Sequence, residues 1–131
     1  MRKALRLLLL LLIPWRVAGA SQLHAVLVFP FENQSGRADL NWVSESFAET
    51  LSSRLSGPGF YVLERGERNA AYDQLGIPAD TPLTVASEYK AAQTLGVDWA
   101  VLGKFNVEGN RLSASARLLD LRQLSSPPPS R

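Results

Sequence analysis

Seven polar side chains are the best candidates for binding a ligand or a partner protein. They follow three apolar segments that have the composition of β-strands. The carboxyl ends of parallel strands meet at one edge of a sheet, where α/β proteins tend to bind ligands. Amide and guanidinium groups gathered at such an edge can hydrogen-bond an anion or a peptide, although a merely solvated loop edge is the alternative. The seven residues are Asn33, Gln34, Arg37, Arg65, Arg68, Asn110 and Arg111.

Other residue types in the chain do not form a pattern that supports catalysis. Glu45 and Glu49 lie four residues apart and share one face of a predicted helix. Glycoside hydrolases instead hold their two carboxylates on opposite sides of a cleft, so we expect this pair to be solvated. His24 is the one histidine, and no serine or cysteine pattern completes a triad with it. The sequence predicts no catalytic residue, no metal site and no cofactor.

Four segments that could position the candidate residues read as β-strands. The first is apolar on both alternating faces, which is typical of a central parallel strand. The fourth alternates between apolar and polar residues, which is typical of a half-exposed edge strand. Its apolar residues, predicted to face the core, are Leu112, Ala114, Ala116 and Leu118. The four predicted strands are residues 23–31, 60–63, 98–107 and 111–121.

Three further segments repeat apolar residues at helical spacing: the first runs from a cap at Asp39 or Asn41 to Leu55, and the others lie at about residues 65–75 and 85–95. Gly96 then supplies a left-handed end to the third helix. The order of elements predicts an α/β fold: a small mixed four-stranded sheet in the order 2-1-3-4, with strand 4 antiparallel and three helices packed on it. We expect one domain over residues 21–122 and, because of three consecutive prolines, a disordered tail over 123–131.

The first 20 residues have the pattern of a secretory signal peptide. Basic residues precede a short apolar run at 7–13, and small residues end the segment at Ala20. A bilayer span needs about 20 apolar residues, so this run is too short. We predict cleavage after Ala20, a periplasmic or secreted location, and no stable membrane span after cleavage. An uncleaved N-terminal anchor is the alternative.

Charge and cysteine content narrow the classes of partner. Of the 14 Lys and Arg residues, four lie in residues 1–20, so ten remain in the predicted mature chain against 12 acidic residues. A mildly acidic domain argues against nucleic acid as a partner. The sequence contains no cysteine, which predicts no disulfide, no thiolate metal site and no cysteine-linked lipid anchor.

Two stretches of the sequence resemble a known family. They are FPFENQSG at 29–36 and LGVDWAVLGKF at 95–105. Their order and spacing are similar to those of the amino-terminal domain of the periplasmic TolB protein. They are more similar still to the TolB-type domain that precedes tetratricopeptide repeats in bacterial envelope proteins. The curli-channel protein and a flagellar accessory protein carry similar folds. The resemblance spans about residues 24–121.

The resemblance implies a non-enzymatic protein-interaction module of the bacterial cell envelope that contacts other envelope proteins. One expectation is a truncated head of a tetratricopeptide-repeat scaffold. The contact would use the loop edge or the open fourth strand, where Ser115→Pro should abolish capture. The alternative is a small-ligand or nucleotide-sensing domain that binds at the carboxyl edge through Asn33, Arg37 and Arg65. A hydrolase is the weakest reading because no activated nucleophile is evident.

Overall fold

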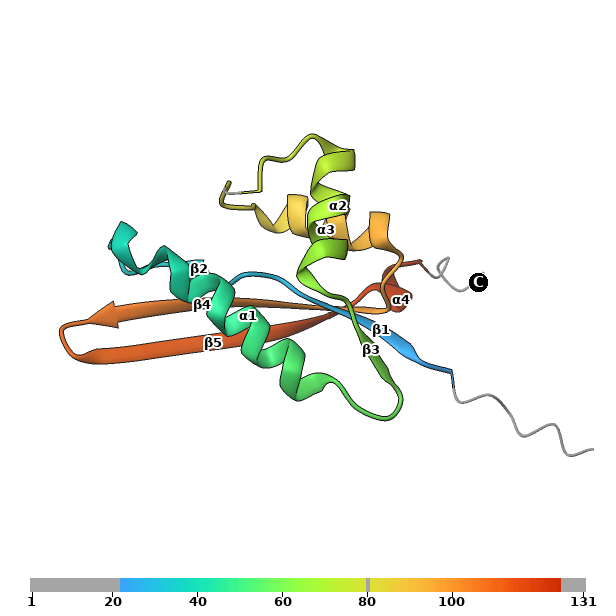
Figure 1. Cartoon of the computed structure of the whole chain (residues 1–131), viewed down its shortest axis with the longest axis horizontal. Helices are drawn as coiled ribbons and strands as arrows, with labels where there is room; N and C mark the ends of the chain where they lie inside the picture. The colour runs from blue at the N-terminus through green and yellow to red at the C-terminus, as the bar shows by residue number, and fades with distance from the viewer. Residues whose placement is uncertain (1–21, 80, 126–131) are drawn as a thin grey trace, which may run out of the picture.

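The computed structural model describes residues 22–79 and 81–125. The predicted signal peptide at 1–20 and residues 126–131 of the predicted tail lie outside the described residues. One β-sheet forms the centre of the fold, with α1 on one face and α2 and α3 on the other (Figure 1). In the two described ranges, no helix is both long and apolar enough to cross a membrane.

The sheet is mixed, which confirms the predicted α/β class. β1 pairs in parallel with β3 on one side and with β4 on the other. β4 pairs antiparallel with β5 over ten residues of each strand, beyond a turn at Gly109 and Asn110. The strands are β1 (His24–Val28), β2 (Glu32–Asn33), β3 (Phe60–Val62), β4 (Trp99–Glu108) and β5 (Arg111–Asp120).

The predicted strand count of four was wrong, because the first predicted strand is interrupted and the sheet has five strands. Pro30 has no N–H to donate, and the N–H of Phe31 donates to the carbonyl of Ser44 in the following helix at 3.1 Å. Pairing with β4 resumes at Glu32, two residues after Pro30. From there β2 runs parallel to β4, with Glu32 opposite Lys104. The strand order therefore differs in detail from 2-1-3-4, since β2 is an additional neighbour of β4.

Two helices, residues 65–75 and 85–95, follow local sequence signals at both of their ends. The Thr84 hydroxyl accepts a hydrogen bond from the Ser87 N–H at 3.2 Å and caps α3. Gly96 has a φ of 64°, which confirms the predicted left-handed end. Residues 123–125, assigned to the tail from the sequence, belong to α4. The helices are η2 (Ala38–Leu40), α1 (Asn41–Leu55), α2 (Arg65–Leu75), α3 (Val85–Leu95) and α4 (Leu121–Ser125).

Alternate residues of the central strands supply two separate apolar layers. On one face, Val26 and Val28 of β1 pack with Val101 of β4 and with Ala48 of α1. On the other face, the packed residues include Tyr72 of α2 and two alanines of α3. The buried members of this second cluster are Leu27, Phe29, Leu63, Tyr72, Ala91, Ala92, Val97, Ala100, Leu102 and Leu121.

The prediction that the apolar residues of β5 face the core was wrong. Leu112, Ala114, Ala116 and Leu118 are all exposed, Leu112 by 55% and Leu118 by 61%. They pair opposite Val107, Phe105, Gly103 and Val101 of β4 and therefore lie on the α1 face of the sheet. However, α1 packs against β1, β2 and β3. The helical layer ends before it reaches β5.

Candidate functional site

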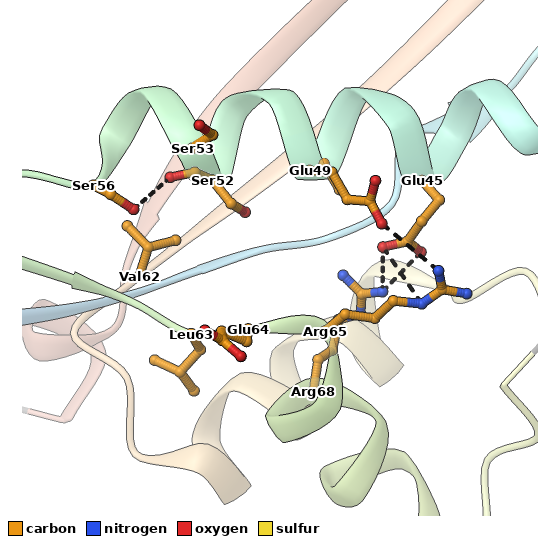
Figure 2. A pocket seen from close by; sticks show the side chains of 11 residues that line it. Glu45, Glu49, Ser52, Ser53, Ser56, Val62, Leu63, Glu64, Arg65 and Arg68 are labelled. Carbon is orange, nitrogen blue, oxygen red and sulfur yellow. Dashed lines mark hydrogen bonds and ion pairs between the residues drawn. The ribbon is translucent and has the colours of Figure 1, made fainter.

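A crevice lies at the carboxyl ends of β1 and β3. The chain leaves β1 toward α1 on one face and leaves β3 toward α2 on the other, which is the arrangement at which α/β sheets bind ligands. A cavity of about 280 Å³ occupies this place, lined by α1, the end of β3 and the first turn of α2 (Figure 2).

The floor of the crevice is an ion pair between α2 and α1. Arg68 is 4% exposed, and its Nη2 lies 2.7 Å from each carboxylate oxygen of Glu45. Its Nη1 donates to the carbonyl of Val28 at the end of β1, at 3.3 Å. The prediction that Glu45 is solvated was wrong, because Arg68 binds its carboxylate. The two residues lie 23 positions apart in the sequence. No local pattern could have paired them.

Arg65 lies beside this pair in Figure 2, where both arginines point toward the acidic residues of α1. Its Nε is 4.0 Å from Glu45 and its Nη1 is 3.7 Å from Glu49. The lining holds three carboxylates, because Glu64 also contributes, against two guanidinium groups. Both cations are thus matched by acids of the protein itself, which disfavours an anionic ligand.

Two buried polar atoms near the crevice have no hydrogen-bond partner among the described residues: the Nε of Arg68 and the hydroxyl of Tyr72. Tyr72 follows Arg68 by one helical turn. Burial raises the pKa of the Tyr72 hydroxyl to about 12, although nearby Arg68 opposes the shift. Arg68 lines the cavity, but its Nε is buried beneath the surface.

The loop after β2 uses its polar groups internally. The Asn33 amide nitrogen donates to the Arg37 carbonyl and to the Asn41 side chain, both at 2.8 Å. The Asn33 side-chain oxygen accepts from the Ser35 N–H at 3.0 Å. Arg37 is paired with Asp39 at 2.7 Å. These contacts hold the loop against the start of α1, so Asn33 and Arg37 serve the local fold.

A second cavity, of about 350 Å³, lies on the face opposite α1 and includes the predicted residue Gln34. Four charged side chains line it: Glu32, Glu88, Lys104 and Arg117. Burial raises the pKa of Glu88 to about 7; Arg117 opposes this shift and Glu32 adds to it. The sequence reading missed Glu88 because the packing of α3 beside the hairpin is what desolvates it.

The seven predicted residues therefore do not form one rim. Arg65 and Arg68 line the crevice, whereas Asn110 and Arg111 lie at the turn of the β4–β5 hairpin, which projects away from α2 (Figure 1). The other three belong to β2 and the loop that follows it. Within the described ranges, no group of three or more His, Asp or Glu residues could hold a metal ion.

The outer edge of β5 is the second candidate surface, and the direction of its backbone groups follows from its neighbours. The carbonyls of Val101 and Phe105 accept hydrogen bonds from Phe29 and Gln34 at 3.0 and 2.8 Å. Odd-numbered residues of β4 thus direct their backbone groups toward β1 and β2, and even-numbered residues direct theirs toward β5. Even-numbered residues of β4 pair with odd-numbered residues of β5.

The remaining residues of β5 direct their N–H and C=O groups to the outside. These are Leu112, Ala114, Ala116, Leu118 and Asp120, and the first four are the apolar residues that are exposed on the α1 face. No strand among the described residues pairs with this edge. A row of open backbone groups beside an exposed apolar strip is a surface on which another strand can add.

Neither a protein-family model nor a curated protein matches this chain. Solved structures with a similar fold include the LpoB C-terminal domain from Escherichia coli, with 17% identity, a TM-score of 0.59, and coverage of 80% of this chain and 77% of that one. The corresponding domain from Salmonella enterica has 18% identity, the same TM-score and the same coverage.

A third similar structure is the lipoprotein GNA1162 from Neisseria meningitidis, with 27% identity and a TM-score of 0.56 over 75% of this chain and 70% of that one. The fold is thus one that occurs in bacterial proteins, including a lipoprotein. None of these three structures is named as a TolB domain or as a tetratricopeptide-repeat protein, so those finer expectations stay predictions.

Proposed function

We propose that this chain is a non-enzymatic protein-interaction module of the bacterial cell envelope and that the outer edge of β5 is its contact surface. The observation that carries the proposal is the open edge, which spans ten residues and is flanked by exposed leucines. Two further facts support it: the fold resembles those of LpoB and of a bacterial lipoprotein, and the chain begins with a signal-peptide pattern.

In this proposal, residues 21–122 act in the periplasm on other envelope proteins. The FPFENQSG and LGVDWAVLGKF stretches support a TolB-type module, such as the head of a tetratricopeptide-repeat scaffold. Asn110 and Arg111 begin the edge and contribute polar contacts to a partner. The acidic balance of the predicted mature chain disfavours nucleic acid as that partner.

The mechanism is addition of a partner strand to the sheet. The partner's backbone would bond to the outward groups of Ala114 and Ala116, which gives affinity that depends little on sequence. Leu112 and Leu118 would pack against side chains on one face of the added strand and supply specificity. Neither step requires a chemical reaction.

The register of β5 decides where a proline tests this mechanism. Ser115 pairs with Lys104 and directs its backbone to β4, so Ser115→Pro would remove a bond inside the sheet and weaken the fold itself. The N–H of Ala116 points outward. Ala116→Pro therefore blocks strand addition while the β4–β5 pairing remains intact, and it replaces Ser115→Pro as the informative variant.

The test is site-specific photo-crosslinking in the living bacterium. A photoreactive amino acid at Leu118 should crosslink another envelope protein, identified by mass spectrometry, and Ala116→Pro should abolish the product. The same group at Thr50, exposed on α1, is the matched control. Equal crosslinking from both positions, or an unchanged product in folded Ala116→Pro protein, would contradict the proposal.

A small-ligand or nucleotide-sensing role is the second candidate, favoured by the crevice at the carboxyl ends of β1 and β3, which Arg65 and Arg68 line. Thermal-shift screening with anionic metabolites tests it. A ligand present at ~100 times its dissociation constant adds about 2.7 kcal/mol to stability, and Arg65→Gln should remove that gain. No shift across the panel would exclude this role.

A further inference from the structure

Residues 112–118 of β5 read almost identically in both directions about Ser115. Leu112 corresponds to Leu118, and Ala114 corresponds to Ala116. Within this stretch a single pair breaks the symmetry, because Ser113 corresponds to Arg117, and just beyond it Arg111 corresponds to Leu119. An interface with two-fold symmetry must be complementary to itself, and a strand that is symmetric in sequence meets this requirement when it runs antiparallel to a copy of itself.

We propose that the outer edge of β5 pairs antiparallel with β5 of a second copy of this chain, with Ser115 opposite Ser115. This inference rests on the proposed function, because it assigns a partner to the same edge. The outward backbone groups meet correctly in this register: Leu112 would exchange hydrogen bonds with Leu118 of the second copy, and Ala114 with Ala116. By symmetry, this gives roughly eight new backbone hydrogen bonds.

Neighbouring registers place unfavourable side chains opposite one another. Pairing between outward backbone groups allows shifts in steps of two residues only. One such shift puts Arg111 directly opposite Arg117 of the second copy, and like charges opposed across strands are destabilising. The shift in the other direction puts Leu112 opposite Asp120. The register centred on Ser115 avoids both pairings and places leucine against leucine.

The proposed pairing also covers the apolar strip that the helices leave open. Leu112 and Leu118 are 55% and 61% exposed on the α1 face. In the pair, each would contact its counterpart from the second copy, and the alanines between them would continue the strip across the joined sheets. On the opposite face, Arg117 would lie beside the uncharged Ser113. Burial of apolar surface and new backbone bonds would thus act together.

Single-cysteine variants report the register directly, because the chain has no cysteine of its own. Two copies of Ser115 would form a pair without hydrogen bonds, with Cα atoms about 4.5 Å apart and within reach of a disulfide. Two copies of Ser113 would lie about 14 Å apart along the strands, beyond that reach. Ser113 and Ser115 are both exposed and share a face of β5, so Ser113→Cys is a matched control.

We expect the full-length protein to sediment as a dimer that dissociates on dilution. Ser115→Cys should give a disulfide-linked dimer under mild oxidation, and Ser113→Cys should not. Adding Ala116→Pro should prevent the crosslink without lowering the melting temperature. A wild-type protein that is monomeric at every concentration, or equal crosslinking of the two cysteine variants, would overturn self-pairing.

The two proposals fail in different ways. If photo-crosslinking from Leu118 yields only products between two copies of this chain, self-pairing holds and the role with other envelope proteins is contradicted. If it yields only products with other proteins and the purified chain is monomeric, the proposed function holds and self-pairing is wrong.

Discussion

The two edge strands of the sheet, β3 and β5, differ in length and in what covers them. The β3 edge is three residues long, follows Gly57 and Pro58, and leads directly into α2. The Tyr61 hydroxyl on this edge donates to the Glu67 carboxylate of α2 at 2.8 Å. The β5 edge is ten residues long and has no such cover within the described residues. Short edge strands are a common protection against unwanted pairing, and only the β3 edge has this protection.

The contrast separates substitutions into two groups. Near β3, the ion pair between α1 and α2 joins the helices on opposite faces, so changes there should alter stability. At Leu112, Ala114, Ala116 and Leu118 of β5 the side chains are exposed, so changes of these side chains should alter association and leave folding almost untouched.

The largest expected effect is that of Arg68→Met. The substitution leaves the Glu45 carboxylate without its cation and the Val28 carbonyl without its donor. We expect a loss of about 3 kcal/mol in unfolding free energy, at the low end for a buried pair because 23% of the Glu45 side chain is exposed. Urea denaturation measures the loss. Arg65→Met is the matched control, at an arginine whose side chain is 60% exposed. It should lower the unfolding free energy by less than about 1 kcal/mol. Equal losses in the two variants would show that the buried ion pair stabilises the fold no more than the exposed one.

Gly103→Ala should have the next largest effect. A Cβ at residue 103 would clash with the ring of Phe31, which is 4% exposed and stacks on Phe47 at 4.9 Å. The buried ring has little room to move, so we expect a loss of about 1–3 kcal/mol. Ala116→Val adds volume at the residue paired with Gly103, on the open side. It should change thermal stability by less than about 0.5 kcal/mol, and a comparable loss would mean that β5 is packed more tightly than its exposure indicates.

Glu88→Gln should make stability less dependent on pH. Because burial raises the pKa of Glu88 from 4.5 to about 7, the folded state binds this proton more tightly than the unfolded chain. The resulting stabilisation is complete below about pH 4.5 and is lost as the pH rises through about 7. At about pH 8 the variant should therefore be more stable than the wild type by on the order of 1 to 2 kcal/mol, and at about pH 4 the two should be similar. Melting curves across this range check the sign, and parallel profiles would contradict it.

Leu118→Ser should have the smallest effect on folding. The side chain is 61% exposed, so the unfolding free energy should change by less than about 0.5 kcal/mol. Self-association should nevertheless weaken measurably in sedimentation, because the substitution removes a leucine from each half of the proposed strip. A large loss of stability without a change in association would reverse the contrast between the two edges.

Regular local patterns allowed much of the fold to be predicted. The expected helices at 65–75 and 85–95 coincide with α2 and α3, and the parallel and antiparallel pairings of β4 follow from its apolar first half and its hairpin turn. The interruption at Pro30 was visible in the sequence. The resumption of pairing at β2 was not, because it depends on the long β4 lying beside it.

The candidate site was less predictable than the elements around it. Arg68 was expected on an open rim, yet it is buried against Glu45 from another helix. Gln34 and Glu88 line a cavity that exists only because α3 packs beside the hairpin. A contact between distant segments leaves no periodic trace in the chain.

The sequence by itself determined α1, α2 and α3, the strands other than β2 and the alternation of β5, because each depends on the chemistry of neighbouring residues. It also contains the symmetry about Ser115. Only the tertiary structure decided that the apolar face of β5 is open, because that depends on how far α1 extends over the sheet. An alternating strand has the same sequence pattern whether a helix covers it or a second molecule does.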